Sequence, residues 1–355
     1  MPAVSVDTFF ACSLMVLLVL SAMAATSKLL YPYINNTIDS DLTERYREIS
    51  KYLLLNDGTP SNWGQSCQTI PTTFGLADAD SGNPYALDVD KVSRLSSENP
   101  YAMSYAQIFT ALKMSDVSFR IEIKPIFDVT INLAAAFQLA NETTYQFEIS
   151  TQENGIPIQT ELRCYAIAED FLETNNVYAS NGVTRFNITI PNDVEGPALL
   201  AAFAKATCDP RIVSFGVYAF AHGSADPKPK DTFLRLGPLN HTLTASFGYS
   251  GINLSRVYAL TIDYHSILEE TSNINQSATY NIPNFLDSSP TLIVATGWNS
   301  TVFFTEWTAY PQIPLQTGAN FADSTALSNV FANTYTVMIN SALYECTVWL
   351  GGPRE

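Results

Sequence analysis

Positive charge is scarce in this sequence of 355 residues, which has 18 lysines and arginines against 34 aspartates and glutamates. The formal net charge is −16, and the basic residues form no run anywhere. Binding to nucleic acid needs a basic surface that neutralises phosphates, so this composition argues against it. The same charge repels anionic lipid headgroups. Any attachment to a membrane must therefore come from an apolar segment.

Histidine is rarer still, with His222, His241 and His265 as its three occurrences. None of them stands in a zinc-protease motif, and the chain also lacks the nucleophile-elbow and phosphate-loop motifs. We therefore expect that the chain is not an enzyme and that it uses no cofactor. A glycan-active enzyme remains a third alternative, because sequence alone does not show which side chains meet in space.

Cysteine is also sparse, and its spacing argues against a zinc site. Cys12 lies in an apolar run, and no two cysteines have the C-x-x-C spacing of zinc ligands. In an oxidising compartment the other four permit two disulfides of open connectivity; the alternative is that they are ordinary buried thiols. These four disulfide candidates are Cys67, Cys164, Cys208 and Cys346.

Charged residues make up 15% of the chain, well below the usual quarter, whereas 46% of it is hydrophobic and 12% aromatic. Ser, Thr, Asn, Gln and 18 tyrosines supply the polarity. This mixture is typical of short β-strands and turns displayed outside a cell. The length is sufficient for two or three domains with their own cores.

The longest apolar run lies near the N-terminus, in VSVDTFFACSLMVLLVLSAMAA, where the 17 residues from Phe9 to Ala25 carry no charge. This length is at the short end of the range for a membrane-spanning helix. Ala22-Met23-Ala24 also fits a signal-peptidase site, although residues 1–25 lack the basic region of a signal peptide. The run predicts either an uncleaved single-pass anchor or a removed signal.

A third interpretation accounts for the carboxylate of Asp7, which stands just before this run. Ala3-Val4-Ser5-Val6-Asp7 followed by an apolar helix resembles the start of mature archaeal type IV pilin-like proteins, which have class III signal peptides. The resemblance implies cleavage after Pro2, which makes Ala3 the first residue and Asp7 the fifth. It also implies assembly, with Asp7 pairing with the α-ammonium group of a neighbouring subunit. Met-Pro departs from the family pattern, which has Lys or Arg followed by Gly there.

The apolar run continues into an amphipathic segment. Apolar side chains recur there with the spacing of one helix face, at Ile34, Ile38, Leu42, Tyr46, Ile49 and Leu53. We expect one helix from Thr8 to Leu55, ended by the turn residues Asn56-Asp57-Gly58. Residues 1–56 are thus predicted to form a transmembrane and stalk helix.

Residues 57–117 are predicted to form a turn and two short helices, Asp90 to Ser97 and Tyr101 to Met114, with Pro100 opening the second. The succession of NDGTPSNWGQ, FGLAD and these helices resembles archaeal surface proteins with class III signal peptides. That resemblance implies a membrane-anchored location on the cell surface.

The remainder of the chain is predicted to be mainly β. Phe119, Ile121 and Ile123 alternate with charged residues, which indicates a half-buried strand, and similar alternation recurs toward the C-terminus. Many short strands separated by turn signals are typical of β-sandwiches. We expect an immunoglobulin-like sandwich over 118–230 and a second β-rich domain over 231–355, joined at the segment HGSADPKPKD.

Glycosylation and calcium are the candidate site chemistries. Seven Asn-x-Ser/Thr sequons occur, at Asn35, Asn141, Asn187, Asn240, Asn253, Asn275 and Asn299. Use of Asn187 requires an outward side chain, because it lies in an expected strand. The oxygens of Asp78, Asp80, Asp88 and Asp90 form a weak calcium candidate. The pattern fails the EF-hand rule, and a turn that caps the next helix is the favoured interpretation.

Aromatic residues offer one further candidate. Trp298, Trp307 and the Tyr310-Pro311 pair would suit a sugar-binding face, although core packing is the more frequent role of aromatics in β-rich chains. The favoured interpretation of the whole is a cell-surface structural and adhesive protein, a pilin-like subunit or minor pilin. The alternative is a monomeric, membrane-anchored ectodomain that binds a glycan or a protein. The expected partners are a membrane, like subunits and other envelope proteins.

Overall fold

The structure is a computed structural model that describes residues 6–114, 116–223, 225–274, 276–284, 290–321 and 330–351, without the side chains of 6–12, 27 and 29–40. The chain divides into two compact units, Met1–Lys51 and Tyr52–Glu355.

Helix α1 covers Val6–Leu55, so the prediction of one continuous helix ending at Leu55 is confirmed. Asn56 and Gly58 end it as turn residues: the Gly58 N–H donates to Asn56 Oδ1 at 2.8 Å, and Gly58 has a φ of +75°. Among the residues that the structure describes, no helix combines the length and the apolar character needed to cross a membrane.

The helices of the segment 57–117 are shorter than predicted. They are η1 (Trp63–Gln65), α2 (Val89–Ser93) and α3 (Tyr105–Leu112). The prediction that Pro100 opens the last helix is wrong. Ser104 opens it, with a capping box in which its hydroxyl accepts from the Gln107 N–H and Gln107 Oε1 accepts from the Ser104 N–H.

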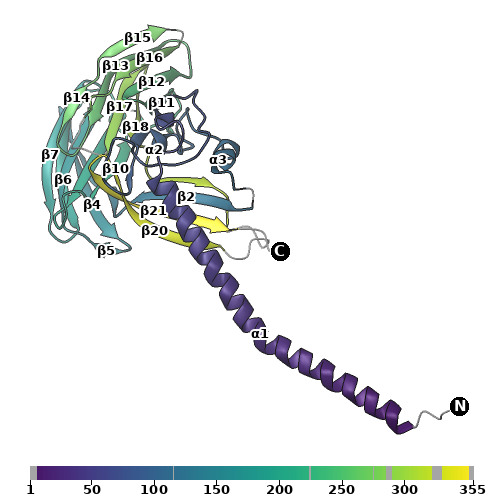
Figure 1. Ribbon diagram of the computed structural model, residues 1–355. Helices are drawn as coiled ribbons and strands as arrows, with labels where there is room; N and C mark the ends of the chain where they lie inside the picture. Colours follow the sequence, from purple (N-terminus) through teal and green to yellow (C-terminus); the bar gives the residue numbers. More distant parts are fainter. Residues whose placement is uncertain are drawn as a thin grey trace. The chain divides into compact units, whose positions relative to one another are not determined.

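The first β-sandwich follows this segment and confirms a mainly-β fold (Figure 1). Its outer sheet contains β3 (Asp128–Gln138), β4 (Glu142–Glu153), β5 (Ile156–Pro157) and β8 (Val183–Pro191). Its inner sheet, in the order β10-β9-β6-β7, contains β6 (Thr160–Ala168), β7 (Phe171–Ala179), β9 (Ala198–Ala206) and β10 (Val213–Phe220). Phe147, Ile149 and Leu200 are among the buried side chains between the two sheets.

The second β-sandwich also has two sheets. The outer one, ordered β11-β12-β16-β15, contains β11 (Leu234–Leu239), β12 (Thr242–Phe247), β15 (Glu270–Ile274) and β16 (Ser277–Asn281). The inner one, ordered β14-β13-β17-β18, contains β13 (Ile252–Leu260), β14 (His265–Ile267), β17 (Thr291–Asn299) and β18 (Val302–Tyr310). Its core includes Phe233, Leu243 and Phe304.

The two sandwiches share one strand order that the sequence does not reveal as a repeat. Strands β3-β4-β8 of the first correspond to β11-β12-β16 of the second, and β10-β9-β6-β7 correspond to β18-β17-β13-β14. In each sandwich the first, second and fifth of these strands form one sheet, and the third, sixth and seventh belong to the other. This is the strand order of immunoglobulin-type sandwiches.

The inner sheets pack against each other. Tyr165, Leu199 and Phe203 of the first sandwich and Tyr258 and Leu260 of the second belong to one buried cluster. Strands β9 and β17 are therefore covered on both faces, which explains why their sequences, ALLAAFAKA and TLIVATGWN, are almost continuously apolar. Together the two sandwiches form a stack of four sheets.

A fifth sheet, ordered β1-β20-β21-β2-β19, corrects the predicted domain limits. It contains β1 (Ala86–Leu87), β2 (Ser118–Pro125), β19 (Leu315–Gly318), β20 (Phe331–Ile339) and β21 (Ala342–Gly351). Strand β2 was expected in the first sandwich but pairs with β21, beside which Figure 1 shows it. The predicted limits at 117/118 and 230/231 thus both lie inside one compact unit, because this pairing joins residues more than 200 positions apart.

We expect Leu260→Ala to unfold both sandwiches at a lower denaturant concentration. Leu260 is fully buried between the inner sheets, so the substitution should cost about 2–5 kcal/mol. The control is Ile267→Ala, whose side chain is exposed and whose cost should stay within about 0.5 kcal/mol. The measurement is unfolding in urea, with circular dichroism as the probe. Two separate transitions, only one of them shifted, would contradict the shared core.

Candidate functional site

A hollow of about 320 Å³ lies where strands of three sheets meet, and we call it the junction hollow. Phe215 comes from β10, Trp307 from β18 and Tyr344 from β21, and prolines complete the wall. Four lining residues carry polar side chains besides tyrosine, namely Glu98, Ser214, Lys230 and Gln312. A mainly apolar wall with a few polar groups is the usual composition of a small-molecule site.

Lys230 lies over the aromatic part of this hollow. Its Nζ is 4.4 Å from the centroid of the Trp307 ring, and it also forms an ion pair with Glu98. Lys230 belongs to the segment predicted as a linker. The last residue of that segment is also held in place, because the Asp231 N–H donates to Glu306 Oε2 at 3.0 Å. The segment is therefore fixed between the sandwiches at this point.

Gln312 supplies an unusual polar group. Its side chain is only 4% exposed; Nε2 donates to Thr308 Oγ1 at 2.9 Å, whereas Oε1 has no hydrogen-bond partner among the residues that the structure describes. A buried carbonyl oxygen without a donor costs about 1–3 kcal/mol. Because protein atoms enclose this oxygen, it is not exposed to the hollow.

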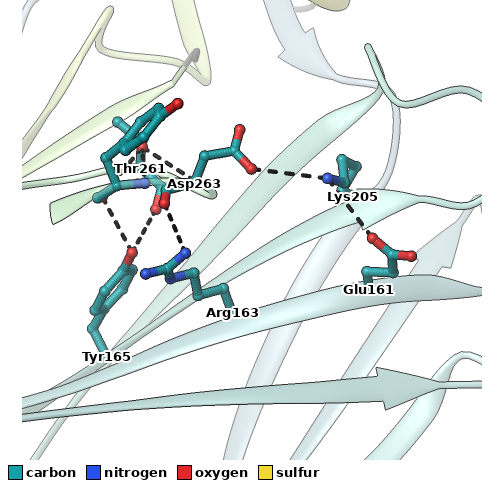
Figure 2. A network of polar contacts seen from close by, with 7 residues as sticks. Glu161, Arg163, Tyr165, Lys205, Thr261 and Asp263 are labelled. Atoms are coloured by element: carbon teal, nitrogen blue, oxygen red, sulfur yellow. Dashed lines mark hydrogen bonds and ion pairs between the residues drawn. The ribbon is translucent and has the colours of Figure 1, made fainter. Parts of the chain in front are cut away.

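A second, polar hollow of about 420 Å³ lies beside the contact between the inner sheets. Figure 2 shows the network at its edge, in which the Tyr165 hydroxyl donates to the backbone oxygens of Thr261 at 2.9 Å and Tyr264 at 3.2 Å. Arg163 Nη1 donates to the Asp263 backbone oxygen at 2.7 Å. Burial raises the pKa of Tyr165 to about 12, so it stays a neutral donor.

The charges of this polar hollow balance one another. Lys205 Nζ lies 3.7 Å from Glu161 Oε2 and 3.9 Å from Asp263 Oδ1 (Figure 2). Since two cations face two carboxylates, the hollow has no excess of either sign to attract an ionic substrate. These contacts join β6 and β9 to the turn after β13, and their role is to hold the two sandwiches together.

Two buried cations organise the segment 57–117. Arg94, over the Trp63 ring, donates to five backbone oxygens, those of Trp63, Ser66, Cys67, Thr69 and Tyr101. Lys91 is fully buried and donates to the oxygens of Asp57 at 2.9 Å and Ala77 at 2.7 Å; burial lowers its pKa. Carbonyl oxygens thus replace water around both cations.

Asp90 links this segment to the second sandwich. Its Oδ1 accepts hydrogen bonds from the Tyr310 hydroxyl and the Asn240 N–H, each at 2.7 Å. Burial raises the pKa of the Asp90 carboxyl, and these two hydrogen bonds offset part of that effect. Burial and the neighbouring Asp90 also raise the pKa of Tyr310.

Three of the four calcium candidates, Asp78, Asp88 and Asp90, accept hydrogen bonds within the chain. Asp88 caps α2, with its Oδ1 accepting from the Asp90 and Lys91 N–H groups at 2.9 Å, as the favoured interpretation of a capping turn predicted. Asp78 Oδ1 accepts from the Asp80 N–H. In the described part of the chain, no group of three or more His, Cys, Asp and Glu side chains is arranged to hold a metal ion.

The disulfide candidates are all free thiols in the structure. Cys67 and Cys208 are exposed, whereas Cys164 on β6 and Cys346 on β21 are buried in different sheets. Burial raises the pKa of each buried thiol to about 12, which leaves them unreactive at neutral pH. Cys164 and Cys346 are therefore buried thiols, as that alternative expects, whereas Cys67 and Cys208 are not buried.

The three histidines lie apart. His222 is buried between the Tyr145 hydroxyl, 2.9 Å from Nδ1, and the Pro191 oxygen, 3.0 Å from Nε2. His241 packs edge-on against Tyr310, and His265 is on β14.

Most sequons of the β region are accessible. Asn141, Asn187, Asn240 and Asn253 are exposed and Asn299 is partly exposed. The outward orientation that the use of Asn187 requires is present. The Asn35 side chain and the whole of Asn275 lie outside the described residues, as do Ala3 and the side chain of Asp7.

The structure separates the aromatic candidates. Trp298 packs against Phe303 with ring centroids 5.4 Å apart, and Tyr310 is buried in the core of the second sandwich. Only Trp307 lines the junction hollow. Sequence analysis missed Glu98, Lys230 and Gln312 as its neighbours, because they come from distant segments that no sequence pattern connects.

We expect Asp90→Asn to change the pH dependence of stability. The substitution keeps an oxygen for both hydrogen bonds but removes the charge. The pKa of Asp90 in the folded protein is raised above the ordinary 3.8. The contribution of this carboxyl to wild-type stability is therefore fully present below pH 3.8 and is lost as the pH rises through the folded pKa. The variant should be the more stable protein at neutral pH, and the difference should vanish in acid.

The measurement is the free energy of unfolding in urea at a series of pH values, from acid below 3.8 to neutral. Asp226→Asn, at an exposed position, is the matched control and should follow the wild type. A stability difference that grows toward acid would contradict the expected sign.

Comparison with known proteins adds little to this geometry. No protein-family model matches the chain, and no curated protein matches it. Among solved structures, HBP35 of Porphyromonas gingivalis is 10% identical, with a TM-score of 0.19 over 52% of this chain and 63% of that one. The FN1–FN3 domains of chicken CNTN1 are 12% identical, with a TM-score of 0.18 over 52% and 67%. The chain thus spans less than two thirds of the first protein's length, and both similarities are too weak to assign a family.

Proposed function

We propose that this chain is a structural and adhesive protein of the cell surface, a pilin-like subunit or minor pilin that assembles through α1. The observation that carries the proposal is the apolar surface of this helix. The seven consecutive side chains from Leu14 to Leu20 are each between 52% and 70% exposed. Seven residues make almost two turns, so the apolar surface surrounds the helix.

A helix that is apolar on all sides is stable only when it is buried. Full burial of one large apolar side chain stabilises by about 1.5–3 kcal/mol, so covering these seven contributes on the order of 10 kcal/mol. A bundle of like helices, or lipid around them, supplies such a cover. The net charge of −16 keeps the rest of the surface soluble and self-repelling, which favours contact through α1.

The N-terminal sequence supports the pilin-like form of this assembly. If processing occurs after Pro2, Asp7 becomes the fifth residue and its carboxylate enters the apolar bundle. A carboxylate there needs a partner, and the new α-ammonium group of Ala3 in an adjacent subunit provides one. The β region would then face solvent, where its accessible sequons fit an extracellular surface.

The second candidate function is that of a monomeric envelope ectodomain that binds a glycan or a protein. The junction hollow favours it, because a cavity with an aromatic wall is a binding feature that is independent of α1. The two candidates differ in whether copies of the chain assemble.

We expect Leu17→Lys to remove the protein from the membrane or filament fraction of native cells. Leu17 lies in the middle of the exposed apolar stretch, and a buried ammonium group there costs several kcal/mol. The measurement is the share of protein in sedimented membranes and in sheared filaments. Ile274→Lys is the control, because it adds the same charge at an exposed position of β15.

Mass spectrometry of the native N-terminal peptide separates the alternatives. A start at Ala3 together with loss of filaments in Leu17→Lys supports a pilin-like subunit. A start at Met1 with membrane attachment alone indicates an anchored monomer, and a start at Ala25 indicates a secreted protein and refutes assembly through α1.

A further inference from the structure

We propose that the junction hollow is a binding site for one neutral sugar ring. Its volume of about 320 Å³ is near the lower limit of small-molecule sites, which are about 300–1,000 Å³. It therefore has room for a single ring rather than for a chain of several. The site belongs to the β region and does not depend on assembly through α1.

The apolar wall selects a ligand with an apolar face. Trp307, Phe215 and Tyr344 provide aromatic surface, and Val213 and Val217 of β10 extend it. The C–H groups on one face of a pyranose are apolar, while its hydroxyls project around the rim. Aromatic side chains contact such a face favourably and leave the rim free for hydrogen bonds.

The polar groups select hydroxyls. Glu98 offers a carboxylate, and Lys230 offers an ammonium group. A hydroxyl both donates and accepts, so a ring with several hydroxyls can satisfy one acceptor and one donor at once.

The charge balance selects a neutral ligand. Lys230 and Glu98 carry opposite charges and pair with each other, so the hollow has no net charge of its own. The chain as a whole carries −16, which disfavours an anion. A cation would have to compete with Lys230 for the face of Trp307. Neither charged class has an advantage over an uncharged ring.

Lys230 covers part of the indole and must move when a ring enters. Its contact with the ring and its ion pair with the largely exposed carboxylate of Glu98 are both of kinds that stabilise only weakly. Both are small compared with the contacts that a ring would make. The side chain is long enough to stay at the rim as a hydrogen-bond donor.

The test is a titration of the full-length chain, held in a detergent without a sugar headgroup. The probes are the methyl glycosides of glucose, galactose, mannose and N-acetylglucosamine. Binding is measured by saturation-transfer NMR and by tryptophan fluorescence. We expect at least one to bind in the millimolar range. Trp307→Ala should weaken it at least about tenfold, which is about 1.4 kcal/mol.

Two variants keep the result interpretable. Trp298→Ala removes another indole, on β17, that does not line the hollow, and should bind as the wild type does. Lys230→Met keeps the length of a partly exposed side chain but not its ammonium group, and should weaken binding severalfold without unfolding the protein. Free monosaccharides that bind as well as the glycosides indicate a free sugar; preference for the glycosides indicates the end of a glycan.

The proposal is overturned if none of the four glycosides binds at tens of millimolar. It is also overturned if Trp307→Ala and Lys230→Met, both folded, bind as tightly as the wild type. Neither outcome bears on assembly through α1, which the membrane and filament fractions test separately.

Discussion

The contact between the inner sheets of the two sandwiches is the constraint on which the rest of this structure depends. It makes one buried layer from strands that would otherwise face solvent, and the buried Leu260 and Phe203 lie in it. Because β9 and β17 are covered on both faces, the sandwiches cannot separate without exposing continuous apolar strands. The polar network of Tyr165 and Arg163 sits at the rim of this layer, where backbone oxygens of the opposite sandwich accept its hydrogen bonds.

The segment 57–117 is held together by hydrogen bonds from buried cations rather than by packed sheets. Its helices are too short to build a core of their own, and buried cations bind its backbone oxygens. Lys91 and Arg94 thereby hold together a loop-rich segment, and Asp90 attaches it to Tyr310 of the second sandwich. The five-stranded sheet then connects the regions before and after the sandwiches, through the pairing of β2 with β21.

The junction hollow follows from this architecture, because strands of three different sheets contribute to its lining. Trp307 and Gln312 line that space, and neither the first nor the second sandwich alone would form it. The exposed apolar surface of α1 is a separate feature of the other unit. Assembly through one and binding in the other are thus physically independent proposals.

The sequence by itself determined the local elements: the end of α1 at Asn56-Asp57-Gly58, the alternation of β2 and β4, and the cap of α2 at Asp88. These depend on neighbouring residues, whose spacing and turn chemistry are visible in the chain. Tertiary structure alone decided the pairing of β2 with β21, the burial of Lys91 and Arg94, and the meeting of Trp307, Lys230 and Gln312. Each of those joins distant segments, and their free energy comes from burial and hydrogen bonds that exist only once the sheets have packed.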